Sequence, residues 1–382
     1  MKPIPVLHII GSLNLGGAEK SLYLLLKNID LNQYPTIVVT LYSTRHDEFF
    51  TTPIEQLGIP IYQLHLKSWH DWRAFLQLRQ IIKKHRIQIV HSHYGALEFY
   101  GTLFGRLAGV RNCIYTKHNV RLKTGFIFNC QRLILNRLLA KRILSISKTV
   151  TRHLLEKEFA PWRKIRLVYN PIESPKKMPR TIARQILGLP HNKLIIGNTS
   201  RYDDWKGFDI FYRTAAILIE KGIAVHTLTL TDENARHVHE RLIAENRLSA
   251  NASLIPFQQE MAPVYSALDF YLITSRHTEG FGMAHVEALS YGIPTISLNV
   301  GVLSEIIQDG KTGILPFPQQ WQPTYKGNVE EAAQAFASSI ERLINNPTKI
   351  ESVRRNALSY AIQFGTATFC LKITNIYRSL CL

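Results

Sequence analysis

The chain has 382 residues, which favours two domains because single hydrophobic cores stop growing at about 250–300 residues. Its residues are 46% hydrophobic and 19% charged, a balance typical of a globular protein in water. No apolar run approaches the roughly 18 residues that span a bilayer, and the Pro-containing start predicts a core strand rather than a signal peptide. Four cysteines without CxxC spacing predict free thiols in a reducing cytoplasm and disfavour a metal site.

The net charge of +18 is concentrated in the first half of the chain. Residues 1–175 hold 25 Lys and Arg against 10 Asp and Glu, whereas the remainder holds 21 against 18. This asymmetry indicates an anionic partner: a membrane surface, a nucleic acid or a phosphorylated substrate. Scattered solvated lysines are the alternative explanation.

The first half alternates apolar strands with amphipathic helices. We expect strands at 6–10, 36–41, 87–91, 113–117 and 142–146, and helices at 18–28, 71–85, 95–107 and 132–140. Alternation with short turns predicts a parallel, doubly wound sheet. The prolines of the segment 168–175 then predict a linker.

The same pattern begins again after the linker. We expect strands at 194–199, 225–230, 252–256, 270–274 and 294–298, with helices at 208–221, 234–248, 283–291, 329–345, 350–364 and 368–380. Two Rossmann-like α/β domains that meet across a cleft follow from this pattern. Ligands of such sheets bind beyond the carboxyl ends of the strands, where every motif below is expected.

The segment from His277 to Glu287 is the most informative in the chain. Two carboxylates, Glu279 and Glu287, flank a turn with Gly280 and Gly282 between a buried strand and a helix. Free backbone N–H groups at the start of that helix would bind a phosphate or diphosphate, and carboxylates suit sugar hydroxyls. The segment therefore predicts a nucleotide-sugar site.

Two cations follow the first strand of the second half. Arg201 and Lys206 frame a turn and could neutralise a diphosphate leaving group. The alternative is an exposed turn in which Asp203 and Asp204 pair with them. The glutamate motif in the same half favours the functional interpretation.

Two further candidates lie in the first half. Gly16 and Gly17 follow the first strand and open a helix, which would let an anion approach the backbone, although such turns are common. His91 and His93 are expected after a strand, where they could form a metal pair; with no third ligand at a sensible spacing, a metal is disfavoured. His118, after the next strand, is the better candidate for sugar contact.

A basic and apolar segment covers residues 121–142. Its cations would suit an anionic membrane surface or acceptor, and a core helix with a solvated basic face is the alternative. The patch residues are Arg121, Lys123, Arg132, Arg137 and Lys141. No nucleic-acid-binding module is recognisable.

These motifs together resemble retaining glycosyltransferases of family 4, also called glycosyl transferases group 1, with a GT-B fold. The similarity covers nearly the whole chain. The most specific match is the two-glutamate motif with Arg201 and Lys206 ahead of it, and the glycine turn at Gly16 is the least specific. The resemblance implies an acceptor-binding domain at 1–171, a nucleotide-sugar-binding domain at 172–365 and a last helix, 366–382, that crosses back onto the first domain.

The resemblance also implies site roles. Arg201 and Lys206 would hold the donor diphosphate, Glu279 the transferred sugar, and Glu287 the ribose. The remaining donor contacts would come from Gly16, Gly17, Gly280, Phe281, Gly282 and, more weakly, Glu305, with His118 against the sugar or acceptor.

The resemblance implies transfer to a glycan or lipid-linked acceptor in bacterial polysaccharide or lipopolysaccharide assembly, on or near the inner face of the plasma membrane. No divalent metal or other cofactor is expected, because cations and a helix end supply its electrostatic role. The nucleobase region lacks glycines that the family usually has, at Thr231 to Glu233 and at Phe257, so UDP rests on family frequency. The alternatives are a non-catalytic or phosphorylase-like protein of this fold, and a basic nucleic-acid-binding protein.

Overall fold

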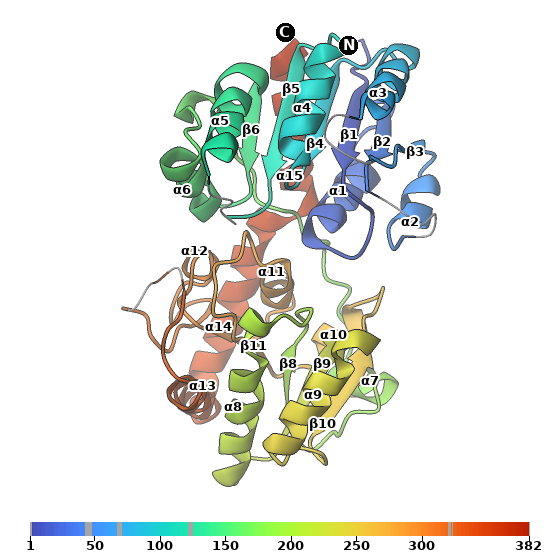
Figure 1. Ribbon diagram of the computed structural model, residues 1–382. Helices are drawn as coiled ribbons and strands as arrows, with labels where there is room; N and C mark the ends of the chain where they lie inside the picture. Colours follow the sequence, from blue (N-terminus) through green and yellow to red (C-terminus); the bar gives the residue numbers. More distant parts are fainter. Residues whose placement is uncertain are drawn as a thin grey trace. The chain divides into compact units, whose positions relative to one another are not determined.

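The computed structural model describes residues 2–42, 48–66, 71–120, 125–319, 322 and 324–381. The chain divides into two compact units, each with its own sheet (Figure 1). The first unit comprises residues 1–173 together with 364–382, and the second comprises residues 174–363.

The sheet of the first unit has seven parallel strands in the order β3-β2-β1-β4-β5-β6-β7. These are β1 (Val6–Ile10), β2 (Thr36–Thr40), β3 (Ile61–Gln63), β4 (Ile89–His93), β5 (Asn112–Lys117), β6 (Arg142–Ser145) and β7 (Ile165–Leu167). The strand order reverses its direction between β1 and β4, which is the switch point where ligands of such folds bind.

Helices connect these strands. They are α1 (Gly17–Asn28), α2 (Thr51–Glu55), α3 (Trp72–Lys84), α4 (Leu97–Leu107), α5 (Phe126–Ile134) and α6 (Lys148–Lys157), with a π-helical turn at Leu135–Leu139 and a 3₁₀ turn at Trp162–Lys164. Helix α3 shows how local sequence fixes a boundary, because the Asp71 side chain accepts hydrogen bonds from the N–H groups of Arg73 and Ala74.

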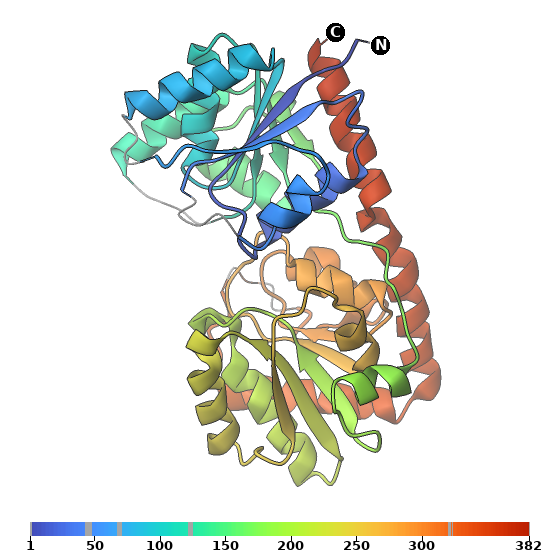
Figure 2. The ribbon, with the colours of Figure 1, turned by 90° about the vertical axis from the view of Figure 1, so that its right-hand side faces the viewer.

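The last helix, α15 (Thr366–Cys381), belongs to the first unit. It packs beside α1, and both termini of the chain lie at the same end of this unit (Figures 1 and 2). Its buried face contributes Phe369, Ile373 and Tyr377 to a hydrophobic cluster with residues of β1 and α1. The C-terminal segment therefore completes the core of the N-terminal unit.

The second unit repeats this architecture with six parallel strands in the order β10-β9-β8-β11-β12-β13. They are β8 (Leu194–Asn198), β9 (Val225–Thr231), β10 (Ala252–Pro256), β11 (Phe270–Ile273), β12 (Thr295–Ser297) and β13 (Gly313–Ile314). Here the order reverses between β8 and β11.

The described helices of the second unit range from 4 to 16 residues. They are α7 (Arg180–Ile186), α8 (Phe208–Glu220), α9 (Glu233–Glu245), α10 (Ala262–Ala267), α11 (Met283–Ser290), α12 (Leu303–Ile306), α13 (Val329–Ile344) and α14 (Pro347–Ala361), with 3₁₀ turns at Asp204–Lys206 and Ile362–Phe364.

The predicted pair of parallel α/β sheets is confirmed, with three differences in the first unit. Short strands β3 and β7 and helices α2 and α6 were not anticipated, because each is short or lacks a continuous apolar run. The helix expected at 132–140 begins earlier, as α5, and ends in a π-helical turn. Strand β4 begins and ends two residues later than expected, so it includes His93 as well as His91.

None of the described helices is long and apolar enough to cross a membrane.

Candidate active site

The strand–turn–helix motif of the second unit has the expected geometry. Strand β11 leads through the turn to α11, whose N-terminal cap is Gly282 in the left-handed conformation at φ +78°. A Cβ atom there would lie 2.4 Å from Cδ2 of His285, so both the backbone conformation and the space require glycine. No side chain caps this helix end, and its N–H groups can bind an anion.

Lys206 and Glu279 form an ion pair at the switch point. The Lys206 Nζ lies 2.7 Å from Oε1 of Glu279, and their side chains are 14% and 10% exposed. The Ser275 hydroxyl donates to the same oxygen at 2.7 Å, and His285 Nε2 lies 3.5 Å from it. The Lys206 ammonium also sits 4.3 Å above the Trp205 ring. The glutamate motif thus contacts Lys206 within the second unit.

The charge state of Glu279 follows from these contacts. Burial favours the neutral acid, but the Lys206 ammonium and the His285 ring outweigh it and hold the pKa of the Glu279 carboxyl well below its usual value. An ionised carboxylate accepts hydrogen bonds only, so Glu279 suits hydroxyl donors.

Arg201 follows β8 on the same edge of the sheet. Its side chain is exposed, and it makes no ion pair with any residue that the structure describes. Lys206 pairs with Glu279 rather than with Asp203 or Asp204. Asp204 accepts a hydrogen bond from the Tyr202 hydroxyl at 2.9 Å. Arg201 therefore remains available to an anion.

Glu287 lies one helix turn into α11, half-buried. The buried Tyr265 hydroxyl donates to its Oε2 at 2.7 Å and lies 3.2 Å from the Thr199 hydroxyl, two residues before Arg201. Glu305 lies in α12, where its backbone carbonyl accepts from the Tyr360 hydroxyl at 3.0 Å. The preceding turn packs closely on the motif, since a Cβ on Gly301 would lie 2.5 Å from Thr278.

In the first unit, Gly16 caps α1 and Gly17 begins it. The backbone of Gly16 is extended, a conformation open to any residue, and an added Cβ would meet only the flexible carboxylate of Glu19. No side chain caps this helix end either. The local structure therefore does not demand glycine at position 16.

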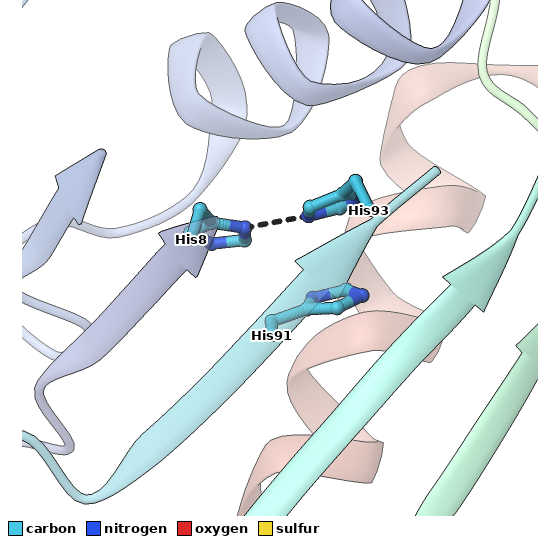
Figure 3. A group of neighbouring side chains, drawn as sticks. All are labelled: His8, His91 and His93. Carbon is cyan, nitrogen blue, oxygen red and sulfur yellow. Dashed lines mark hydrogen bonds between the residues drawn. The ribbon is translucent and has the colours of Figure 1, made fainter. Parts of the chain in front are cut away.

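The two histidines of β4 are joined by a third, so the expectation that no third ligand accompanies them is wrong. Parallel pairing of β1 with β4 sets His8 opposite His91, and ligand atoms of His8, His91 and His93 lie within 4.8 Å of one another. Figure 3 shows His8 and His93 pointing toward each other, with His8 Nδ1 3.0 Å from His93 Nε2. This cluster depends on pairing between strands 80 residues apart, which no local spacing reveals.

Protein partners occupy all six ring nitrogens of this cluster. His91 contacts the Tyr377 hydroxyl at 2.8 Å and the Thr116 hydroxyl at 2.7 Å. His8 Nε2 lies 3.5 Å from the Tyr377 hydroxyl, and His93 Nδ1 lies 3.4 Å from His118 Nε2. Burial lowers the pKa of His8 to about 3 and moves the pKa values of His91 and His93 well below the usual value, so these rings are neutral at pH 7.

His118 lies just beyond the end of β5 and is buried at 9% exposure. Burial, and then the charge of Lys117, lower the pKa of His118 to about 3. Its Nδ1 has no hydrogen-bond partner among the residues that the structure describes. The ring lines a cavity of about 10 Å³, close to the smallest space that holds a water molecule, together with Ser21, His93 and Asn170.

The basic segment divides into an interior and a surface part. Arg132 does not belong to the predicted surface patch: it is buried, and its guanidinium lies 2.5 Å from Glu98 and 3.6 Å from Glu158. Lys117 pairs with the same two acids at 3.2 and 2.7 Å. Arg132 is buried because its guanidinium pairs with Glu98 of α4 and with Glu158 at the end of α6.

The surface part retains Arg137 and Lys141, both exposed. Arg121 and Lys123 lie outside the described residues. Large apolar side chains accompany the exposed cations: Phe126 is 83% exposed, Ile127 75% and Leu138 68%.

Sequence reasoning did not anticipate several partners of the candidate residues. Ser275 and His285 lie within the motif and could have been noticed as polar residues at a buried turn. Tyr265 of α10 contacts Glu287, and Tyr377 of α15 contacts the histidine cluster. Nothing in the sequence around either tyrosine indicates these contacts.

Comparison with known proteins identifies the class. Residues 179–360 match the family described as glycosyl transferases group 1, and residues 15–174 match glycosyltransferase family 4. A D-inositol 3-phosphate glycosyltransferase of Thermobispora bispora is 25% identical over 319 residues, which are 76% of this chain and 70% of the relative.

Solved structures share the fold. A glycosyltransferase from Rickettsia africae superimposes with a TM-score of 0.84 at 18% identity, covering 100% of this chain and 99% of its own. The Anabaena protein HepE, solved with UDP and glucose, gives a TM-score of 0.81 at 19% identity, covering 98% and 100%. The fold and site thus define a glycosyltransferase of the GT-B class. The chain belongs to glycosyltransferase family 4, the group 1 glycosyl transferases.

Proposed function

We propose that this glycosyltransferase moves a sugar from a nucleotide-sugar donor, UDP-linked, to a hydroxyl of a glycan or lipid-linked acceptor with retention of anomeric configuration. The observation that carries the proposal is the Lys206–Glu279 pair beside the uncapped start of α11. A diphosphate binds cations and the N–H groups at the start of a helix, and a sugar binds ionised acceptors. Lys206, the start of α11 and Glu279 are groups of these kinds.

Each residue has a role in this proposal. The Lys206 ammonium has three donors, so it can hold Glu279 and a diphosphate oxygen together, while exposed Arg201 binds the same group in a bidentate manner. Ionised Glu279 accepts from hydroxyls of the transferred sugar, and Glu287 from the ribose. Support for UDP comes from HepE, which was solved with UDP and glucose.

Retention is the stereochemical part of the proposal. A double displacement would need a carboxylate nucleophile, and the described lining of the His118 cavity contains none. Glu98 and Glu158 are held in buried ion pairs. Front-face attack through an oxocarbenium-like state is therefore favoured, in which the departing diphosphate takes the proton of the acceptor hydroxyl. Lys206, Arg201 and the α11 N–H groups stabilise the leaving charge, so we expect no requirement for a divalent metal.

The acceptor side of the proposal rests on the first unit. We propose that exposed Phe126, Ile127 and Leu138, with Arg137 and Lys141, bind the anionic inner face of a plasma membrane, where a lipid-linked or phosphorylated acceptor of surface polysaccharide or lipopolysaccharide assembly would be found. The Thermobispora relative, named for inositol 3-phosphate, supports a phosphorylated acceptor.

The donor is tested with a thermal-shift panel of UDP-, GDP- and ADP-sugars, each with and without a chelator. We expect one UDP-sugar to raise the melting temperature and the chelator to leave that shift unchanged. Stabilisation by GDP- or ADP-sugars alone would overturn the choice of UDP, and loss of the shift with chelator would overturn metal independence. The anomeric configuration of the product, read by proton NMR, tests retention.

A further inference from the structure

The histidine cluster of the first unit forms a continuous hydrogen-bonded chain. It runs from the Thr116 hydroxyl through His91 to Tyr377, then through His8 and His93 to His118. All its members are at most 9% exposed, and α15 contributes Tyr377 from the far end of the sequence. Each neutral ring has one N–H and one bare nitrogen, so a choice at one position fixes the next.

The hydroxyl of Tyr377 sets the direction of the chain. Burial raises the pKa of this hydroxyl well above its usual value, so it keeps its single proton. That proton goes to the nearer nitrogen, His91 Nδ1 at 2.8 Å, rather than to His8 Nε2 at 3.5 Å. His91 then carries its own proton on Nε2, which donates to Thr116 at 2.7 Å.

The other branch follows from the same choice. The Tyr377 oxygen, having donated its proton, accepts from His8 Nε2–H, which leaves His8 Nδ1 bare. His93 Nε2–H donates to that nitrogen at 3.0 Å, and His118 Nε2–H donates to the bare His93 Nδ1 at 3.4 Å. The chain ends at His118 Nδ1, a bare nitrogen without a protein partner on a ring that lines the cavity.

We infer that Tyr377, acting through His8 and His93, holds His118 in the Nε2–H tautomer, so that His118 Nδ1 accepts a hydrogen bond from a hydroxyl of the substrate. Tyr377, His8 and His93 are positioning residues, and only His118 touches the ligand. The identity of that hydroxyl, on the transferred sugar or the acceptor, rests on the proposed function; the tautomer itself does not.

The test uses the full-length protein with ¹⁵N-labelled histidine rings. Nitrogen chemical shifts distinguish protonated from bare ring nitrogens, and His118→Gln assigns the His118 signals. We expect a bare Nδ1 and a protonated Nε2 on His118. Tyr377→Phe removes one hydroxyl and keeps the ring; it should shift the His8 and His91 signals most and give His118 a mixture of tautomers.

Tyr34→Phe is the matched control. Tyr34 is a buried tyrosine whose ring centre lies 5.8 Å from that of Tyr377, but its hydroxyl accepts from Arg378 Nε at 3.0 Å, outside the chain. It should leave all four histidines unchanged. A protonated Nδ1 on wild-type His118, or equal effects of the two variants, would overturn the inference. Joint movement of the His8, His91 and His93 signals on adding zinc would replace it with a metal site.

An activity measurement separates this inference from the proposed function. With the donor found by the thermal-shift panel, Tyr377→Phe should lower kcat/KM roughly three- to tenfold, the effect of one neutral hydrogen bond, and Tyr34→Phe should not. If no donor binds, the proposed function fails while the nitrogen shifts still decide the tautomer. If a donor binds and the two variants transfer sugar equally well, the tautomer has no role in the reaction and the inference fails.

Discussion

The two units share one strand order yet place opposite chemistry at the point where that order reverses. Between β1 and β4 the first unit carries neutral, buried imidazoles linked to one another. Between β8 and β11 the second unit carries an ammonium and a carboxylate that are 14% and 10% exposed. Ligands of such folds bind where the strand order reverses, and there the two units present different side chains.

Charge serves different purposes in the two units. In the second unit the Lys206–Glu279 pair is partly exposed to solvent, so either side chain can also contact a ligand. In the first unit the charges of Lys117, Arg132, Glu98 and Glu158 are buried together and neutralise one another. We interpret the first set as functional and the second as structural.

The largest effect should come from breaking the structural set. Arg132→Met leaves Glu98 and Glu158 with Lys117 as their remaining charged partner, apart from His153 beside Glu158, and should lower the free energy of unfolding by about 3–5 kcal/mol. Urea unfolding followed by circular dichroism measures it. Arg137→Met, five residues on and exposed, is the control and should change little. Equal decreases in the free energy of unfolding for the two variants would contradict a stabilising role of the buried ion pairs.

The functional set should respond in rate. Lys206→Ala removes a cation that we propose holds the leaving group, and it should lower kcat by about 10²–10³-fold. Lys221→Ala, which removes a lysine of the same unit paired with Glu341 at 2.7 Å, should leave kcat unchanged. Steady-state release of the nucleotide measures both. Near-normal turnover of Lys206→Ala would contradict the assignment of the site.

The turn before α11 offers a smaller and more local test. Gly282→Ala should cost about 1–3 kcal/mol of stability because a left-handed residue acquires a Cβ that collides with His285. Gly222→Ala is a close control, since Gly222 has φ +81° and no atom within 4 Å of an added Cβ. Thermal unfolding of both variants separates conformational cost from collision. If Gly222→Ala costs as much, the close approach to His285 is unimportant.

The smallest effects belong to the surface of the first unit. Arg137→Gln and Lys141→Gln should each weaken binding to anionic vesicles by about 1 kcal/mol, roughly fivefold. Lys83→Gln, an exposed cation at the end of α3, is the control and should bind as the wild type does. Co-sedimentation at moderate salt measures the binding. No difference among the three would place the membrane contact elsewhere or exclude it.

The sequence predicted the alternation of elements well, because parallel strands here are short apolar runs between amphipathic helices. It also predicted that Lys206 and Glu279 lie at the carboxyl-end edge of the second sheet. The strands that precede them, β8 and β11, pair directly. It ended the strand two residues too early, before His93, because histidines interrupt the apolar run of β4 although all five of its residues are buried.

Contacts between distant segments could not be predicted from local patterns. His8 meets His91 through strand pairing, and Tyr377 reaches the same cluster from a helix 286 residues further along the chain. Arg132 looked like a surface cation because its acidic partners come from α4 and the end of α6. In each case the deciding partner is absent from the neighbouring sequence.

The packing of α15 on the first unit has a consequence for synthesis. The N-terminal unit buries Phe369, Ile373 and Tyr377 in its core, and the ribosome makes these residues only after the whole second unit. The second unit, residues 174–363, is continuous in the chain and can finish folding first. The nascent N-terminal unit therefore keeps part of its core uncovered until α15 has been made.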